Sequence, residues 1–198
     1  MKSIGFANQK GGVGKSSLCC SLAAYAGDAL ILDVDPQATA SQWFRSRPEQ
    51  YELPECAMAR PRDVGRAVKA TARRWVFIDT PGDLTAREAL DSSDLVVVPV
   101  RASIHDLRAA ARTVELLQGR RGVFVINAAP VPRATAESPF VVEARRALGA
   151  YPLELCPVVI HQRAAWVHSG IAGLGVSEWD DAKASQEIKE LWAWLSAR

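Results

Sequence analysis

The feature that most constrains the fold of this chain is a glycine-rich turn near its start, Gln9-Lys10-Gly11-Gly12-Val13-Gly14-Lys15-Ser16-Ser17. An apolar run at residues 3–7 predicts a short buried strand before it, and helically spaced apolar residues at 16–25 predict a helix after it. Backbone N–H groups of such a strand-to-helix turn can surround a phosphate group. Lys15 would then contact the outer phosphates and Ser16 could ligate Mg²⁺, so the turn predicts a bound nucleoside triphosphate with Mg²⁺.

The front of this turn departs from the usual phosphate-binding pattern. Gln9 occupies the position of the expected first glycine, and Lys10 follows it. A loop that begins with a lysine and ends in Lys15-Ser16 resembles the deviant P-loop of the ParA/MinD family of ATPases. The resemblance implies that Lys10 reaches across a nucleotide-sandwich dimer to the phosphates bound by the partner.

Two other interpretations of the turn stay open. Lys10 could be a solvated lysine beside an ordinary P-loop, because motif matches include false positives. The pair Gly12 and Gly14, followed about twenty residues later by Asp33, also fits a dinucleotide-binding turn. Ser17, however, stands where that fingerprint needs a third glycine.

Length and composition predict one α/β domain. The chain has 198 residues, of which 48% are hydrophobic and 23% are charged, which suits a single full core. Strand-like runs alternate with helical ones, which predicts a doubly wound, mainly parallel sheet flanked by helices. Three prolines make residues 47–62 the most irregular segment, with room for one short strand at 56–58. The predicted strands after the first are residues 29–33, 75–79, 95–100, 123–127 and 155–160.

The sequence also bears on the cellular compartment and on metal binding. No apolar run is long enough to cross a bilayer and no signal peptide is recognisable, so we expect a cytoplasmic protein. The four cysteines lack CxxC spacing, which indicates reduced packing residues rather than a metal site. The three histidines also lack metal-ligand spacing.

Acidic residues follow two of the predicted strands. In parallel sheets, ligands bind beyond the carboxyl ends of the strands, so these acids should face the glycine-rich turn. Asp79 is the residue expected to hold Mg²⁺ through water molecules, because this ion keeps several waters when bound. Asp33-x-Asp35-Pro36-Gln37 resembles a ParA-type motif, which implies that Asp35 positions or activates the attacking water and that Asp33 supports the Mg²⁺ shell. Both acids could instead cap local turns.

The ParA/MinD resemblance also implies a base-binding residue and a domain organisation. Asn127 falls where the family places an asparagine that contacts adenine, and Pro130 lies in a proline-bearing segment beside the base. A turn-forming asparagine at a strand end is the alternative. Because the P-loop begins at residue 9, we expect residues 1–198 to be one domain without the N-terminal DNA-binding extension of larger relatives.

Several basic residues are candidates for DNA binding. The net charge of +2 means that any DNA binding must come from a local patch. Arg62 and Arg66 begin a basic stripe at helical spacing, which is also typical of a solvated helix face. Arg163 matches an arginine that ParA-like proteins use on DNA, with a structural salt bridge as the alternative. A second basic stripe consists of Arg101, His105, Arg108 and Arg112.

The resemblance therefore implies a small ParA-type partition ATPase. Its cofactors would be ATP and Mg²⁺, and its ATP-bound homodimer would bind duplex DNA non-specifically until hydrolysis, stimulated by a ParB-like adaptor, resets it. The alternatives are MinD-like positioning on a membrane through an amphipathic helix with Ile188, Leu191 and Leu195, positioning of other cargo, and ligase-like chemistry on the same scaffold.

Overall fold

The computed structural model describes residues 2–83, 85–117, 119–132 and 137–198. The side chain of Arg108, from the second basic stripe, lies outside the described residues, as does Arg133 after the proline-bearing segment. A seven-stranded sheet, in which every pairing is parallel, has the strand order β3-β2-β4-β1-β5-β6-β7. This confirms the predicted fold class. The strands are β1 (Lys2–Phe6), β2 (Ala29–Asp33), β3 (Glu55–Met58), β4 (Trp75–Asp79), β5 (Leu95–Arg101), β6 (Gly122–Ala129) and β7 (Glu154–His161).

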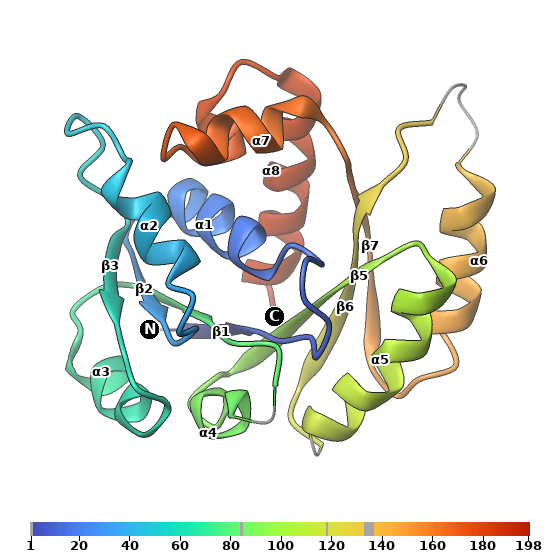
Figure 1. Ribbon diagram of the computed structural model, residues 1–198, viewed down its shortest axis with the longest axis horizontal. Coiled ribbons are helices and arrows are strands. Elements are labelled where there is room, and N and C mark those ends of the chain that lie inside the picture. Colours follow the sequence, from blue (N-terminus) through green and yellow to red (C-terminus); the bar gives the residue numbers. More distant parts are fainter. Residues whose placement is uncertain (1, 84, 118, 133–136) are drawn as a thin grey trace.

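Helices cover both faces of the sheet (Figure 1). One core cluster joins the sheet to helices on the first face, and two further clusters join it to helices on the second. The first face carries α1 (Lys15–Ala26), α2 (Thr39–Arg45), α7 (Ala164–Ile171), the short turn η2 (Val176–Glu178) and α8 (Ala182–Ser196). The second carries η1 (Pro61–Asp63), α3 (Val64–Ala70), α4 (Ala86–Leu90), α5 (Ile104–Leu117) and α6 (Pro139–Leu148).

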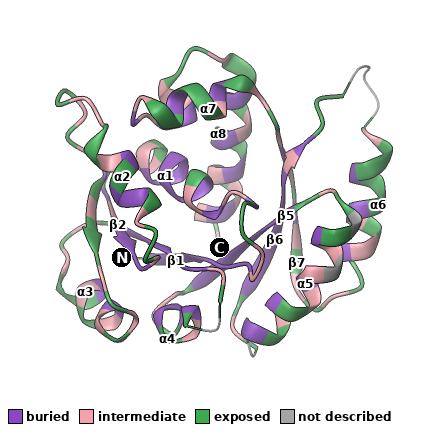
Figure 2. Ribbon diagram, viewed as in Figure 1, coloured by how far each residue is buried: buried purple, intermediate pink, exposed green. Residues whose placement is uncertain are grey.

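The strand order places a crevice beside β1. The strands β4, β2 and β3 lie on one side of β1, and β5, β6 and β7 lie on the other. At such a switch point the loops leave the sheet in opposite directions, so a crevice opens beyond the carboxyl ends of the strands. The glycine-rich turn directly follows β1 and therefore lies at this crevice, while the strands beneath it are buried (Figure 2).

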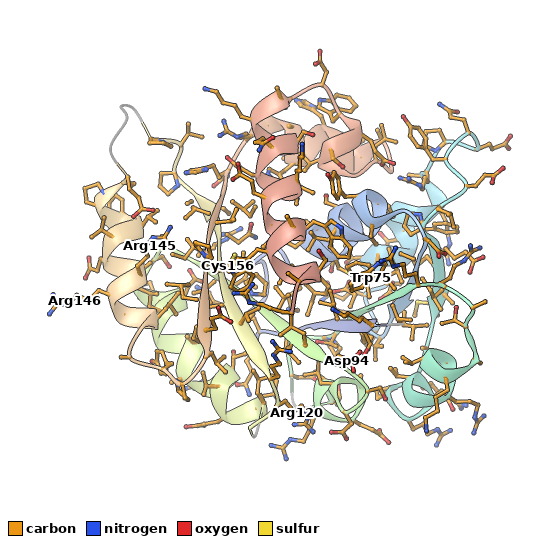
Figure 3. The ribbon with its side chains drawn as sticks, turned by 180° about the vertical axis from the view of Figure 1, so that it is seen from behind. Trp75, Asp94, Arg120, Arg145, Arg146 and Cys156 are labelled. Atoms are coloured by element: carbon orange, nitrogen blue, oxygen red, sulfur yellow. The ribbon has the colours of Figure 1, made fainter. Side chains whose placement is uncertain are left out.

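The C-terminal helix packs against the sheet rather than presenting an apolar face. Ile188 and Leu191 are fully buried, and the Trp192 ring contacts the Trp75 ring edge-on at 4.6 Å between centroids. Figure 3 shows Trp75 beside the end of α8. The stripe that suggested a membrane-binding helix therefore belongs to the core. Within the described part of the chain, no helix has the length and apolar character needed to cross a bilayer.

Candidate nucleotide-binding site

The backbone of the glycine-rich turn has the shape of a phosphate-binding loop. Gly12 and Gly14 have φ values of +71° and +91°, a region that L side chains rarely adopt. A Cβ atom on Gly14 would lie 2.3 Å from Nδ2 of Asn127, so only glycine fits at this position. α1 starts at the next residue, and its first N–H groups face the crevice. The turn therefore forms an anion site.

Lys15 lies inside this site. The residue is 8% exposed, and its Nζ donates to the carbonyl oxygen of Asn8 at 3.2 Å. Burial lowers the pKa of the Lys15 ammonium, and the nearby carboxylates of Asp79, Asp35 and Asp83 oppose this shift. A phosphate group would add further negative charge beside this desolvated ammonium.

Asp79 is the best candidate for holding a cation. It is fully buried at the end of β4, and neither carboxylate oxygen accepts a hydrogen bond from a described residue. Burial raises the pKa of Asp79 to about 7; the nearby charge of Asp33 adds to the shift, whereas Ser16 and Lys15 oppose it. A buried carboxyl group without donors is costly, and a cation would remove that cost.

The character of the site suits Mg²⁺. Within the described residues, no group of three or more His, Cys, Asp or Glu side chains could hold a metal ion. Mg²⁺ does not need such a cage, because it binds through one or two protein oxygens, phosphate oxygens and waters. Asp79 and the Ser16 hydroxyl would hold Mg²⁺ beside the phosphates, where the ion would neutralise phosphate charge.

The acids after β2 have different geometries. Asp33 is fully buried, and its two carboxylate oxygens accept from the backbone N–H groups of Asp35 at 3.2 Å and Ser41 at 2.8 Å. Each oxygen thus accepts one hydrogen bond, which fixes the carboxylate and shapes the loop, and each keeps a second lone pair that could support the Mg²⁺ shell. Asp35 is half-buried and lines the phosphate cavity, and one of its oxygens accepts from the N–H of Gln37 at 2.9 Å. Its other oxygen can accept from a water.

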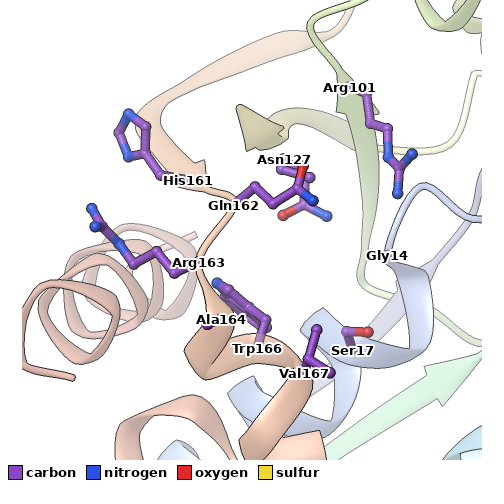
Figure 4. A pocket seen from close by; sticks show the side chains of 11 residues that line it. Gly14, Ser17, Arg101, Asn127, His161, Gln162, Arg163, Ala164, Trp166 and Val167 are labelled. Carbon is purple, nitrogen blue, oxygen red and sulfur yellow. The ribbon is translucent and has the colours of Figure 1, made fainter. Parts of the chain in front are cut away.

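A second cavity of about 320 Å³ adjoins the phosphate site, and Figure 4 shows the side chains that line it. Gly14 and Ser17 line both cavities, so one ligand could occupy the two. Nδ2 of Asn127 donates to the carbonyl oxygen of Val13 at 2.7 Å. The amide keeps its second N–H and its oxygen, the pair that matches N7 and the amino group of adenine. Pro130 is exposed and does not appear among the described residues that line this cavity.

Sequence reasoning missed two residues of this second cavity. Arg101, at the end of β5, points toward Gly14 in Figure 4, although its sequence pattern suggested a helix stripe. Trp166 of α7 supplies an aromatic wall, and its buried indole N–H has no partner among the described residues. No local sequence signal marks either residue, because the order of the strands in the sheet, rather than the neighbouring sequence, brings both side chains to the cavity.

Lys10 does not point toward the phosphate cavity. Its Nζ lies 2.8 Å from Oδ1 of Asp106 near the start of α5, and the side chains are 39% and 4% exposed. The other oxygen of Asp106 accepts from the Ser103 hydroxyl. The lysine that resembles the family's dimer residue is thus held within its own chain, by an acid 96 positions away.

The candidate DNA-binding residues lie on two different faces. Arg163, at the start of α7, donates to Glu187 of α8 at 2.8 Å, and His161 Nδ1 lies at the same distance from the same oxygen. The structural salt bridge considered for Arg163 is therefore present. Arg62 and Arg66 are exposed on η1 and α3, on the opposite face of the sheet from α7 (Figure 1). One copy does not bring the three arginines together.

The parallel sheet, the left-handed glycines and the buried lysine define a P-loop nucleotide-binding protein. Residues 4–190 match the model of the CobQ/CobB/MinD/ParA nucleotide-binding domain, and the chain belongs to this family.

The chain is also similar to individual members of this family. The chain is 26% identical over 187 residues to "Maintenance of carboxysome distribution protein A" of Gloeobacter kilaueensis, covering 90% of this chain and 85% of that protein. It is 31% identical over 154 residues to the "Chromosome-partitioning ATPase Soj" of Thermus thermophilus, covering 60% of this chain and 62% of that protein. Its fold matches apo McdA of Cyanothece with a TM-score of 0.83 at 15% identity, over 98% of this chain and 99% of that structure. Other solved structures of this fold hold ATP, AMPPNP or Mg-ADP.

Proposed function

We propose that this chain is an ATPase that drives DNA partition. In this proposal ATP and Mg²⁺ occupy the two adjoining cavities, two ATP-bound copies dimerise, and the dimer binds duplex DNA without sequence preference. ATP hydrolysis, stimulated by a ParB-like adaptor protein, then dissociates the dimer into monomers. The chain would act in the cytoplasm, on the nucleoid.

The observation that carries the nucleotide part is that Gly14 and Ser17 line both cavities, so the two lie side by side. The phosphate end offers left-handed glycines, Lys15 and Asp79, and the other end offers the Asn127 amide with an edge complementary to adenine. Guanine presents an oxygen where adenine has its amino group, so the Asn127 oxygen would face another acceptor. ATP is therefore the favoured ligand.

The hydrolytic step follows from the position of Asp35. Its free oxygen lies at the phosphate cavity, where it would accept a proton from, or orient, the attacking water. Lys15 would stabilise negative charge on the outer phosphates. Asp33 would keep the loop in shape, because it accepts from the Asp35 N–H.

Lys10 supports the proposed dimer, and the dimer in turn supports the proposed DNA binding. A nearly neutral monomer binds duplex weakly, whereas a dimer doubles the phosphates that are neutralised. Lys10 supports the dimer proposal because it is long, 39% exposed and placed at the front of the loop. The relative named for carboxysome distribution favours a second candidate, in which the same cycle positions another cargo.

One experiment tests the proposal directly. Sedimentation of the protein without nucleotide, with ADP and with AMPPNP, each with and without a labelled duplex of arbitrary sequence, measures dimerisation and DNA binding together. We expect a dimer and DNA binding with AMPPNP only, and an affinity that falls steeply with salt as counterions are released. Equal DNA binding in the nucleotide-free, ADP and AMPPNP states would refute it. Vesicle flotation with ATP tests the membrane alternative, and turnover that depends on a small-molecule co-substrate but not on DNA would indicate a ligase.

A further inference from the structure

A single carboxylate of the C-terminal helix holds one wall of the second cavity. We call this cavity, which Asn127 lines, the base cavity, and its wall is the segment His161-Gln162-Arg163 between β7 and α7. Oε2 of Glu187, in α8, accepts from the His161 backbone N–H at 3.0 Å. Its Oε1 lies 2.8 Å from both His161 Nδ1 and an Arg163 guanidinium nitrogen. A carboxylate only accepts, so His161 carries a proton on Nδ1, and Glu187 fixes both neighbours of Gln162.

The sheet holds the middle residue of this wall as well. The backbone N–H of Gln162 donates to the carbonyl oxygen of Ala129 at 2.8 Å, two residues after Asn127 on β6. In Figure 4 the Gln162 side chain extends from the wall toward Asn127, and both side chains line the base cavity. The backbone of Gln162 is thus fixed by β6 directly and by Glu187 through its two neighbours. Its amide can offer a donor and an acceptor to a ligand in the cavity.

The contacts of Glu187 are largely shielded from solvent. The side chains of Glu187, Arg163 and His161 are 12%, 15% and 19% exposed. Taking a carboxylate out of water is costly, and the surrounding donors compensate only while their geometry is kept. This network therefore holds the wall in one arrangement. The apolar side chains of α8, such as Ile188 and Leu191, pack in the core without needing this charge.

We propose that Gln162 contacts the base of the bound nucleotide and that Glu187 is the positioning residue that holds it there. The proposal rests on the proposed ATP site and adds two residues to its base end, and it depends neither on dimerisation nor on DNA. A base in this cavity would meet one amide from β6, that of Asn127, and a second from the segment after β7. The alternative is a salt bridge that only stabilises the packing of α8. The two interpretations differ in what the loss of Glu187 does to ligand binding.

The test compares the affinities for ADP and for pyrophosphate, each with Mg²⁺, by calorimetry. In the proposed function ADP does not promote dimerisation, so its affinity reports on the site of one copy. Pyrophosphate can fill the phosphate cavity but has no base for the base cavity. Glu187→Gln keeps the size of the side chain but places a donor group where N–H groups need an acceptor, so the wall should loosen. ADP affinity should fall about fivefold, as for the loss of one hydrogen bond, with unchanged pyrophosphate affinity.

A double-variant cycle shows whether Glu187 acts through Gln162. Gln162→Ala removes the base contact itself and should show the same loss of ADP affinity. If Glu187 positions Gln162, the double variant should also lose about fivefold, whereas two independent contacts would lose about 25-fold. The matched control is Glu190→Gln. Glu190 is exposed on the same helix and accepts from the Gln186 side chain at 2.8 Å, so neither affinity should change.

A second substitution covers the case in which Glu187→Gln does not fold. Glu187→Asp keeps the charge but draws it back by one methylene group, and its ADP affinity should also fall at unchanged pyrophosphate affinity. A loss in Gln162→Ala alone would overturn the positioning role of Glu187, even if the melting temperature of Glu187→Gln is lower. Wild-type ADP affinity in both variants, or an equal fall of both affinities, would overturn the whole proposal and leave the proposed function intact. A wild-type protein that binds ADP no more tightly than pyrophosphate would overturn the proposed ATP site as well.

Discussion

The ion pair between Lys10 and Asp106 makes a prediction about the monomer-dimer equilibrium. If Lys10 must reach the phosphates of a partner, it must first leave Asp106, and each monomer loses one ion pair on dimerising. Asp106→Asn removes the charge of the acceptor but keeps an oxygen for the Ser103 hydroxyl. This variant should therefore dimerise more tightly than the wild-type protein in AMPPNP.

The expected size follows from the exposure of the two side chains. The Lys10 side chain is 39% exposed, so solvent screens the pair even though Asp106 is only 4% exposed. A pair of this kind contributes about 1 kcal/mol net. Two pairs are lost per dimer, so about 2 kcal/mol is recovered in Asp106→Asn, which corresponds to about a 30-fold lower Kd of the dimer.

Analytical ultracentrifugation over a concentration series measures this Kd. Lys10→Ala breaks the same ion pair but also removes the lysine, so it should raise the Kd of the dimer. Substitutions of the two partners of one ion pair should therefore change this Kd in opposite directions. Asp91→Asn, which breaks the surface pair with Arg120, is the control and should leave the Kd unchanged. If Asp106→Asn dimerises no more tightly than wild type at equal melting temperature, the ion pair does not restrain Lys10.

Three further outcomes are expected. Asp35→Asn keeps an acceptor for the Gln37 N–H but loses the base, so ATP turnover should fall roughly 10²- to 10⁴-fold with nearly unchanged AMPPNP binding by calorimetry; unchanged turnover would refute the assignment. Burial raises the pKa of Asp79 to about 7 in the folded state, above its ordinary value of 3.8 in the unfolded chain. Between these values the folded protein keeps a proton that the unfolded chain has lost, so its stability falls as the pH rises through this window. The melting temperature of nucleotide-free Asp79→Asn should therefore exceed that of wild type at pH 8, with the gap closing toward pH 4, and a gap that is constant with pH would contradict this. Asn127→Ala should reduce the preference for ATP over GTP by roughly 10-fold or more in calorimetric affinities, because the adenine-matching amide edge is lost; an unchanged ratio would show that the base lies elsewhere.

Sequence patterns predicted those features of the fold that are determined by short, continuous segments of the chain. Strand-like runs and the glycine spacing lie within short segments, so the parallel sheet and the strand-to-helix turn followed from them. Asp79 was also accessible, because a carboxylate at the end of a buried strand must face the crevice of a parallel sheet.

Contacts between distant segments were not accessible. Lys10 and Asp106 are 96 positions apart, and Arg163 and Glu187 come from different helices, so only the packing of the sheet brings each pair together. The apolar periodicity of α8 did not distinguish a core face from a membrane face either. The same pattern serves both, and the partner surface, here Trp75 and the sheet, decides between them.

The arrangement of faces constrains how a dimer would hold DNA. Arg163, at the start of α7, must give up Glu187 before its guanidinium can reach a phosphate group. Arg62 and Arg66 need no such exchange, since both are exposed on the face of the sheet opposite α7. Duplex bound through these two arginines would leave the nucleotide mouths free for a second copy. DNA binding and dimerisation would then use separate surfaces. Nucleotide would control DNA binding by controlling dimerisation, because a dimer carries two basic faces where a monomer carries one.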